Sequence, residues 1–240
     1  MMEARFLRKP QEESESYFIS MTDLMVGLVL IFIILLAYFA LNLQARTAEL
    51  TGANKARAEI LKDMAEALKE QGLEVTIDIE TGVLRLPDDV LFESGQYRLT
   101  VRGEAAVAKV ATAMSAILPC YTEGAKCDGE RSPHPVDAIF VEGHTDKDRM
   151  SGGMDNYDLS VMRAANTFRA LKAVNPIVDQ MRNLPVDAPG SAKILSLSGY
   201  GPDRYVDAGE SPAAKARNRR IDLRFLMMSP GALSRDSLVR

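Results

Sequence analysis

Residues 18–41 read FISMTDLMVGLVLIFIILLAYFAL. This stretch is a candidate membrane anchor, distinct in composition from the rest of the chain. About 24 residues rising roughly 1.5 Å each give a helix of about 36 Å, enough to cross a bilayer with some tilt. We expect a transmembrane helix over residues 18–43, preceded by a charged cytoplasmic tail over residues 1–17. A cleaved signal peptide is disfavoured, because the apolar run is too long and follows several acidic residues.

Asp23 is the single charged residue of the apolar run. A carboxylate in hydrocarbon costs several kcal/mol, and its usual explanation is ion or proton handling against a partner. A local alternative exists, because Ser20 and Asp23 form the S-x-x-D pattern of a helix capping box, which would place Asp23 in the first helical turn. One helix with one carboxylate cannot form a pore, so the ion-translocating interpretation requires helices from a partner.

The composition limits the possible partners of the chain. The net charge is −4, tryptophan is absent and aromatic residues make up 6%, which disfavours nucleic-acid binding.

Cys120 and Cys127 lie in a short polar loop. If this loop is outside the cytoplasm, a disulfide is the natural interpretation. The alternatives are two free thiols, or a zinc site with His134 that lacks an obvious fourth ligand.

The short N-terminal tail indicates how the chain is oriented in the membrane. Lysine and arginine are nearly balanced on the two flanks of the apolar run, so the positive-inside rule does not decide the topology. The short tail favours an N-terminus in the cytoplasm and a C-terminal domain in the periplasm, and the cysteine pair agrees with this.

Residues 44–72 are rich in Ala, Glu, Lys and Leu and predict a periplasmic helical linker that continues the membrane helix. Leu61, Met64 and Leu68 recur at helical spacing. This apolar stripe could pair with a second copy or pack on its own domain, and Gly72 is the expected end of the helix.

Beyond Gly72 the pattern alternates between strands and helices. Apolar residues alternate over residues 75–79 and resume at 83–86, which predicts a hairpin. Helices are expected over residues 100–118 and 159–174, and strands over 138–141, 194–197 and 220–227. This order predicts an α/β sandwich with the helices on one face of a mixed sheet.

Four motifs place polar side chains at the ends of these elements: VEGHTD at 141–146, NYDLSVMRAANTFRAL at 156–171, GYGPDR at 199–204 and ARNRRIDLRF at 216–225. Asp146 follows a strand, and Arg163 lies in the following helix. The two can converge on a cleft for a ligand that carries both an amine and a carboxylate. The ordinary alternative is a salt bridge that joins loop and helix.

These motifs, in this order, resemble the OmpA-like peptidoglycan-binding domain over residues 73–228, which leaves a C-terminal tail at 229–240. The resemblance implies a β/α sandwich that binds the diaminopimelate of the peptide stem, with Asp146 on the ammonium and Arg163 on a carboxylate. Residues that would shape the cleft are Thr145, Asn156, Leu159, Asn218, Arg219 and Arg220. The segment KDRMSGGMD, residues 147–155, is longer than the corresponding loop of most members.

A membrane helix with an early aspartate, followed by this domain, resembles the MotB class of stator subunits. The helix sequence is most similar to the MotB-like ZorB class of the Zorya anti-phage defence system. The resemblance implies a homodimer inside a ring of multi-span ZorA- or MotA-like subunits in the bacterial inner membrane, with Asp23 carrying protons. No enzymatic activity, cofactor or metal is expected. The alternatives are a flagellar stator subunit and a passive tether between membrane and wall.

Overall fold

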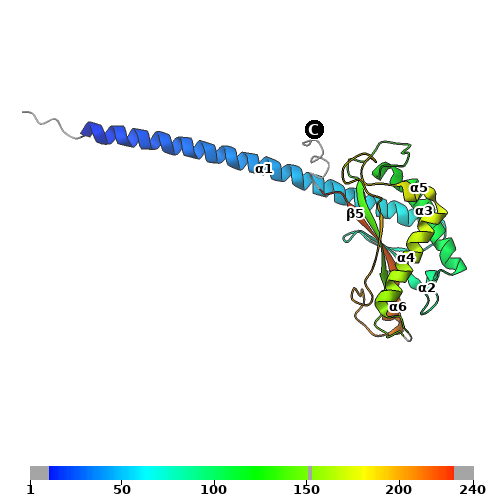
Figure 1. Ribbon diagram of the computed structural model, residues 1–240. Coiled ribbons are helices and arrows are strands. Elements are labelled where there is room, and N and C mark those ends of the chain that lie inside the picture. The colour runs from blue at the N-terminus through cyan, green and yellow to red at the C-terminus, as the bar shows by residue number, and fades with distance from the viewer. Residues whose placement is uncertain (1–10, 151–152, 230–240) are drawn as a thin grey trace, which may run out of the picture. The chain divides into compact units, whose positions relative to one another are not determined.

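The computed structural model describes residues 11–150 and 153–229, without the side chains of residues 11–17 and 19. The chain divides into two compact units, Met1–Glu49 and Leu50–Arg240. Helix α1 (Gln11–Glu70) contributes to both units (Figure 1). Residues 1–10, part of the expected tail, and residues 230–240, most of the C-terminal tail, lie outside the described residues.

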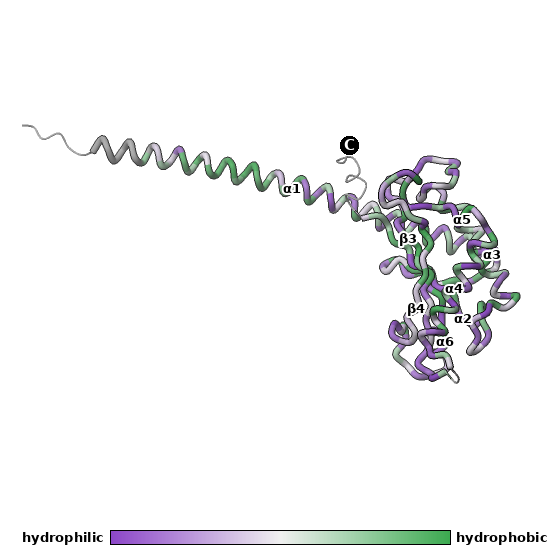
Figure 2. Tube along the Cα trace, viewed as in Figure 1, coloured by the Kyte–Doolittle hydropathy of each residue, from purple (hydrophilic) through white to green (hydrophobic). Residues whose placement is uncertain are grey.

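The first unit holds the apolar part of α1. Its most apolar 18-residue window has a mean hydropathy of 3.0 and no residue buried inside the protein, so by length and composition the helix could cross a membrane (Figure 2). Ser20 lies inside α1 and does not cap it, because the helix begins at Gln11. Residues 11–17, expected in the tail, are also helical. Asp23 is therefore an interior helical residue, and the capping-box alternative is wrong.

The last part of α1 belongs to the second unit. Ile60, Leu61, Met64 and Leu68 are fully buried and join its hydrophobic core. The apolar stripe thus packs on its own domain, one of the two arrangements that the sequence left open. The helix ends as expected near Gly72, whose φ of +71° lets the Leu73 amide donate back to the Leu68 carbonyl at 2.9 Å.

The domain is built on one five-stranded sheet in the order β1-β2-β5-β3-β4. Strands β3 and β4 are parallel, and the other neighbouring pairs are antiparallel. The expected hairpin is present, with Asp78 opposite Val83 and Gly82 at φ +74° in the turn. The strand bounds are β1 (Thr76–Asp78), β2 (Val83–Pro87), β3 (Val136–His144), β4 (Leu195–Gly199) and β5 (Arg220–Met227).

Two long helices, α3 (Val101–Ile117) and α4 (Asn156–Val174), pack against each other, and α4 also packs on β3 and β4 (Figure 1). On β5 the side chains alternate, so that Ile221, Leu223 and Phe225 enter the core while polar residues occupy the other face. The fold is therefore the expected mixed α/β arrangement. Shorter elements that the sequence did not reveal are α2 (Asp88–Leu91), α5 (Pro176–Gln180), α6 (Pro212–Asn218) and a 3₁₀ turn at Leu118–Tyr121.

The loop after α3 is closed by a disulfide between Cys120 and Cys127, whose Cα atoms lie 4.8 Å apart. Both sulfur atoms are used in this bond, so neither thiol is available to a metal ion.

Candidate functional site

The motif residues meet at one end of the sheet. Strands β3 and β5 are antiparallel, and His144 at the end of β3 lies opposite Arg220 at the start of β5. The residues after β3, including Asp146, therefore lie beside the residues that precede β5, including Arg219. Helix α4 begins in the same region with a capping box. The side chain of Asp155 accepts a hydrogen bond from the backbone amide of Asp158, and the side chain of Asp158 accepts one from the backbone amide of Asp155.

Asp146 forms an ion pair with Arg219 that is partly open to solvent. Nη1 of Arg219 lies 2.7 Å from Oδ2 of Asp146, and the two side chains are 34% and 12% exposed. The start of the long loop is held by Asn156, whose amide donates to the carbonyls of Asp146 at 3.2 Å and Asp148 at 2.9 Å. Lys215 of α6 also pairs with Asp148 at 2.6 Å. The amide of Asp148 donates to Oδ1 of Asp146 at 3.1 Å, so the start of the loop holds the Asp146 side chain in place.

Arg163 pairs with a different carboxylate and is buried, with a relative exposure of 1%. Its Nη1 lies 2.9 Å from Oδ2 of Asp88, and its Nε donates to the Gln96 carbonyl at 2.8 Å. The guanidinium also lies over the ring of Phe92, 5.1 Å from the centroid. The sequence placed Arg163 opposite Asp146 across a cleft, whereas the structure gives each of them a different partner.

Asp88 is the residue that the sequence analysis missed. It opens the four-residue helix α2, and the adjacent acids of LPDDVLF give no sign that only the first is buried. Burial raises the pKa of Asp88 to about 6, against the opposing effect of the charges on Arg163 and Arg219. Nε of Arg219 lies 4.0 Å from Oδ2 of Asp88. Arg219 therefore lies between two carboxylates, Asp88 and Asp146.

The other expected site residues lie around these pairs. Asn218 holds the loop before α6, because its Oδ1 accepts from the amides of Val206 and Asp207 at 2.9 and 3.0 Å. Leu159 is buried on α4, and Thr145 is buried with no hydrogen-bond partner for its hydroxyl in the described part of the chain. Arg220 is buried and donates to Asp222 at 3.0 Å. Arg220 also lines a cavity of the domain, whereas the side chains of Asn218, Leu159 and Thr145 support the site from within the fold.

A second buried charged cluster lies on the polar face of the sheet. Glu142, His144 and Asp222 approach one another as metal ligands would. Burial alone would raise the pKa of Glu142, but His144 and Arg224 lower it to about 2. Both carboxylates are neutralised by guanidinium groups at 2.9–3.1 Å, so the cluster is poorly suited to a cation. The arginines concerned are Arg85, Arg220 and Arg224.

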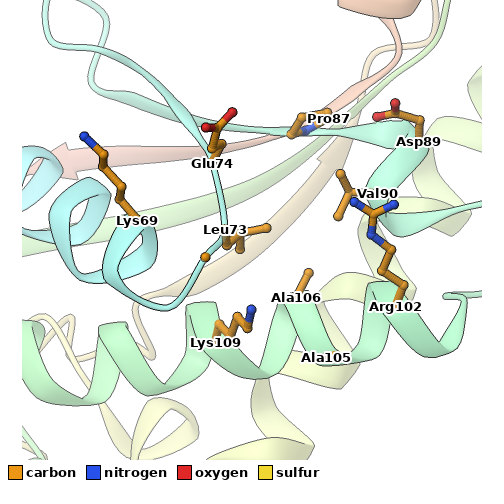
Figure 3. Close-up of a pocket in the computed structure, with 11 residues that line it drawn as sticks. Lys69, Leu73, Glu74, Pro87, Asp89, Val90, Arg102, Ala105, Ala106 and Lys109 are labelled. Atoms are coloured by element: carbon orange, nitrogen blue, oxygen red, sulfur yellow. The ribbon is translucent and has the colours of Figure 1, made fainter.

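Two cavities of the domain differ in their relation to the site. The larger, about 750 Å³, lies between the end of α1, the start of α2 and α3, and Figure 3 shows the basic side chains of Lys69, Arg102 and Lys109 around it. None of the motif residues lines it. The smaller, about 310 Å³, includes Arg219 in its lining. Three more arginines line this smaller cavity: Arg85, Arg217 and Arg220. The Asp146–Arg219 pair therefore borders an arginine-lined hollow.

No protein-family model matches the sequence, and no curated protein matches it. Several solved structures are similar. The periplasmic domain of Helicobacter pylori MotB is 19% identical, with 65% of this chain and 82% of that chain covered and a TM-score of 0.46. The cell wall anchor of the T6SS from Pseudomonas aeruginosa is 20% identical, with 70% of this chain and 96% of that chain covered and a TM-score of 0.46. A MotB-like protein from Desulfovibrio vulgaris is 20% identical, with 80% of this chain and 97% of that chain covered and a TM-score of 0.48.

Proposed function

We propose that the chain is a subunit of a proton-driven motor in the bacterial inner membrane, held in place by peptidoglycan. The lone carboxylate of Asp23 in the apolar part of α1 supports the motor, and the convergence of separate motifs on the partly exposed Asp146–Arg219 pair supports the attachment to the wall. A carboxylate and a guanidinium side by side match the ammonium and carboxylate of a diaminopimelate side chain. The N-terminus would lie in the cytoplasm and the domain in the periplasm, where its disulfide is stable.

Asp23 would carry the proton. When protonated, its side chain is neutral and can face lipid or apolar protein, and when ionised it favours cationic or hydroxyl groups of a partner. Each proton that crosses about 100–150 mV releases on the order of 2.3–3.5 kcal/mol. The path requires further helices, which a second copy of the chain and a multi-span subunit of the ZorA or MotA class would supply. Attachment to the wall provides the reaction force against which a surrounding ring can turn.

The proposed biological role is anti-phage defence of the Zorya type. It is supported by the resemblance of the apolar segment to the ZorB class. In this role the motor would act during phage infection. The flagellar alternative predicts a loss of motility, instead of a loss of phage protection, when the subunit is inactivated.

The test is Asp23→Asn in the native host, because the amide keeps the shape of the side chain and removes its proton chemistry. We expect proton flux and phage protection to be lost, while the amount of protein and its attachment to purified sacculi are unchanged. Asn42→Ala is the matched control, since Asn42 is a polar residue of the same helix that donates to the Tyr38 carbonyl. Its proton flux should equal that of the wild type.

A passive tether predicts a different outcome. In that case Asp23→Asn would be silent, and only the loss of wall binding in Asp146→Ala would have an effect. Wild-type proton flux in Asp23→Asn would therefore reject the motor and leave the tether.

A further inference from the structure

The larger cavity of the domain takes no part in the proposed attachment to the wall. Its volume of about 750 Å³ is in the range of pockets that hold small ligands. The last turn of α1, the turn that follows it, the start of α2 and one face of α3 form its walls (Figure 3). All of its lining residues belong to the second unit, Leu50–Arg240, so the cavity lies within one folded domain.

Small and apolar residues form the middle of this cavity. Helix α3 contributes Ala105 and Ala106, and the turn after α1 contributes Gly72, where an added Cβ would meet no heavy atom within 4 Å. Ala106 and Leu73 are buried and lie between the charged side chains in Figure 3, whereas Ala105 is exposed. The middle of the cavity is therefore apolar, and an exposed position of α3 gives access to it.

Charged side chains of both signs line the two ends of the cavity. Lys69 and Glu74 lie at the end of α1, and Asp89 and Arg102 lie where the start of α3 packs on α2 (Figure 3). All four side chains are exposed, and none of them forms an ion pair or a hydrogen bond within the described part of the chain. Each end of the cavity thus offers one cation and one anion whose charges are not neutralised by a neighbour.

Lys109 adds a third cation near the end of α1. Its Nζ donates to the Gln71 carbonyl at 2.6 Å, which uses one of its three N–H donors and fixes the ammonium beside the cavity. The other donors can serve a carboxylate. Cations therefore outnumber anions at the α1 end of the cavity, and a ligand anion is favoured there.

We propose that this cavity is a second ligand site, which binds a short peptide with free termini. The carboxylate of the peptide lies between Lys69 and Lys109, and its ammonium contacts Asp89. Its middle packs on Leu73 and Ala106. Opposite charges that face a cavity without pairing are the groups that a zwitterionic ligand engages, whereas a simple anion or cation would leave one sign unused. The proposal does not depend on the attachment to peptidoglycan, because none of these residues belongs to that site.

The experiment is titration calorimetry of trialanine on the full-length protein in detergent at low ionic strength. N-acetyl-trialanine and trialanine amide should each bind about tenfold more weakly than trialanine, because each lacks one charged terminus. The effect of the amide should shrink in Lys69→Gln, and the effect of acetylation should shrink in Asp89→Asn. Lys62→Gln and Glu104→Gln change exposed residues of α1 and α3 outside the cavity, and they should behave as the wild type.

A steric variant tests the cavity itself. Ala105→Phe fills the cavity from an exposed position, so the binding of trialanine should be lost. Urea unfolding and attachment to purified sacculi should stay those of the wild type. Ala116→Phe is the matched control, because Ala116 is exposed on the same helix and does not line the cavity. It should bind trialanine normally.

Two dipeptides separate the sources of such a ligand. L-Ala-D-Glu has the configuration of the wall stem, and L-Ala-L-Glu that of ordinary protein fragments. Tighter binding of the first identifies released wall peptide as the ligand, tighter binding of the second identifies protein fragments, and either result supports the site.

Two results would overturn the proposal: a wild type that does not bind trialanine, and an Ala105→Phe variant that binds it as tightly as Ala116→Phe does. A folded Ala105→Phe variant that has lost sacculus attachment together with peptide binding would overturn the independence of the two sites. Failure of the wild type to bind sacculi would reject the wall attachment and leave the peptide site standing.

Discussion

The pair formed by Asp88 and Arg163 should be the most sensitive ionic contact of the domain. At 2.9 Å and an effective dielectric constant of about 20, the attraction between the two charges is about 6 kcal/mol. Desolvation opposes much of this attraction, but removing one partner leaves the other charge buried. The raised pKa of Asp88 means that ionising its carboxyl group costs stability, but the group contacts Arg163 in either form. Asp88→Ala removes this contact and leaves the guanidinium buried alone, so we expect it to lower the free energy of unfolding by about 3–5 kcal/mol.

The assay is urea unfolding of the full-length protein in detergent at pH 7.5, followed by near-ultraviolet circular dichroism. The tyrosines of the domain provide this signal, and the protein contains no tryptophan. The control is Lys126→Met, because Lys126 pairs with Asp128 at 2.8 Å while both side chains are almost fully exposed. We expect Lys126→Met to change the stability by well under about 1 kcal/mol.

The double variant Asp88→Ala/Arg163→Met separates the ion pair from other effects. With both charges removed, no unpaired ion remains, so the loss should be much smaller than the sum of the two single losses. An Asp88→Ala variant as stable as Lys126→Met would refute the argument. So would a double variant whose loss equals the sum of the single losses.

Two further predictions concern the same domain. Burial raises the pKa of Asp88 to about 6, so from about pH 4 to pH 6 the folded state binds more protons there than the unfolded chain. The stability of the wild type relative to Asp88→Asn should therefore fall by up to about 3 kcal/mol as pH rises through this window, and urea titrations that show a constant difference would contradict this. Because the Cys120–Cys127 bond closes a loop with a sequence separation of 7, replacing both cysteines by serine should cost about 2–3 kcal/mol, measured by urea unfolding without reductant. An unchanged urea midpoint in this variant would show that the bond adds no stability.

Much of the fold was predictable from local patterns. The hairpin, α3, α4 and β5 each contain enough alternating or helical periods to be recognised, and Gly72 marks the end of α1 because a glycine tolerates positive φ. The short helices α2, α5 and α6 were missed, since one or two turns contain too few periods to distinguish a helix from a loop. The start of α1 was misplaced, because its polar first turns lack the apolar signal that identified the rest.

The sequence by itself determined that Asp146 and Arg219 lie at the same end of the sheet, because their motifs follow one strand and precede another, but it gave no sign of Asp88. It also determined that Asp23 stands alone in an apolar helix. Only the tertiary structure decided how the charges pair. Asp88 lies 75 positions before Arg163 and is buried against it, so Asp146 takes Arg219 instead. Pairing depends on distance and burial in three dimensions, and local sequence patterns contain neither.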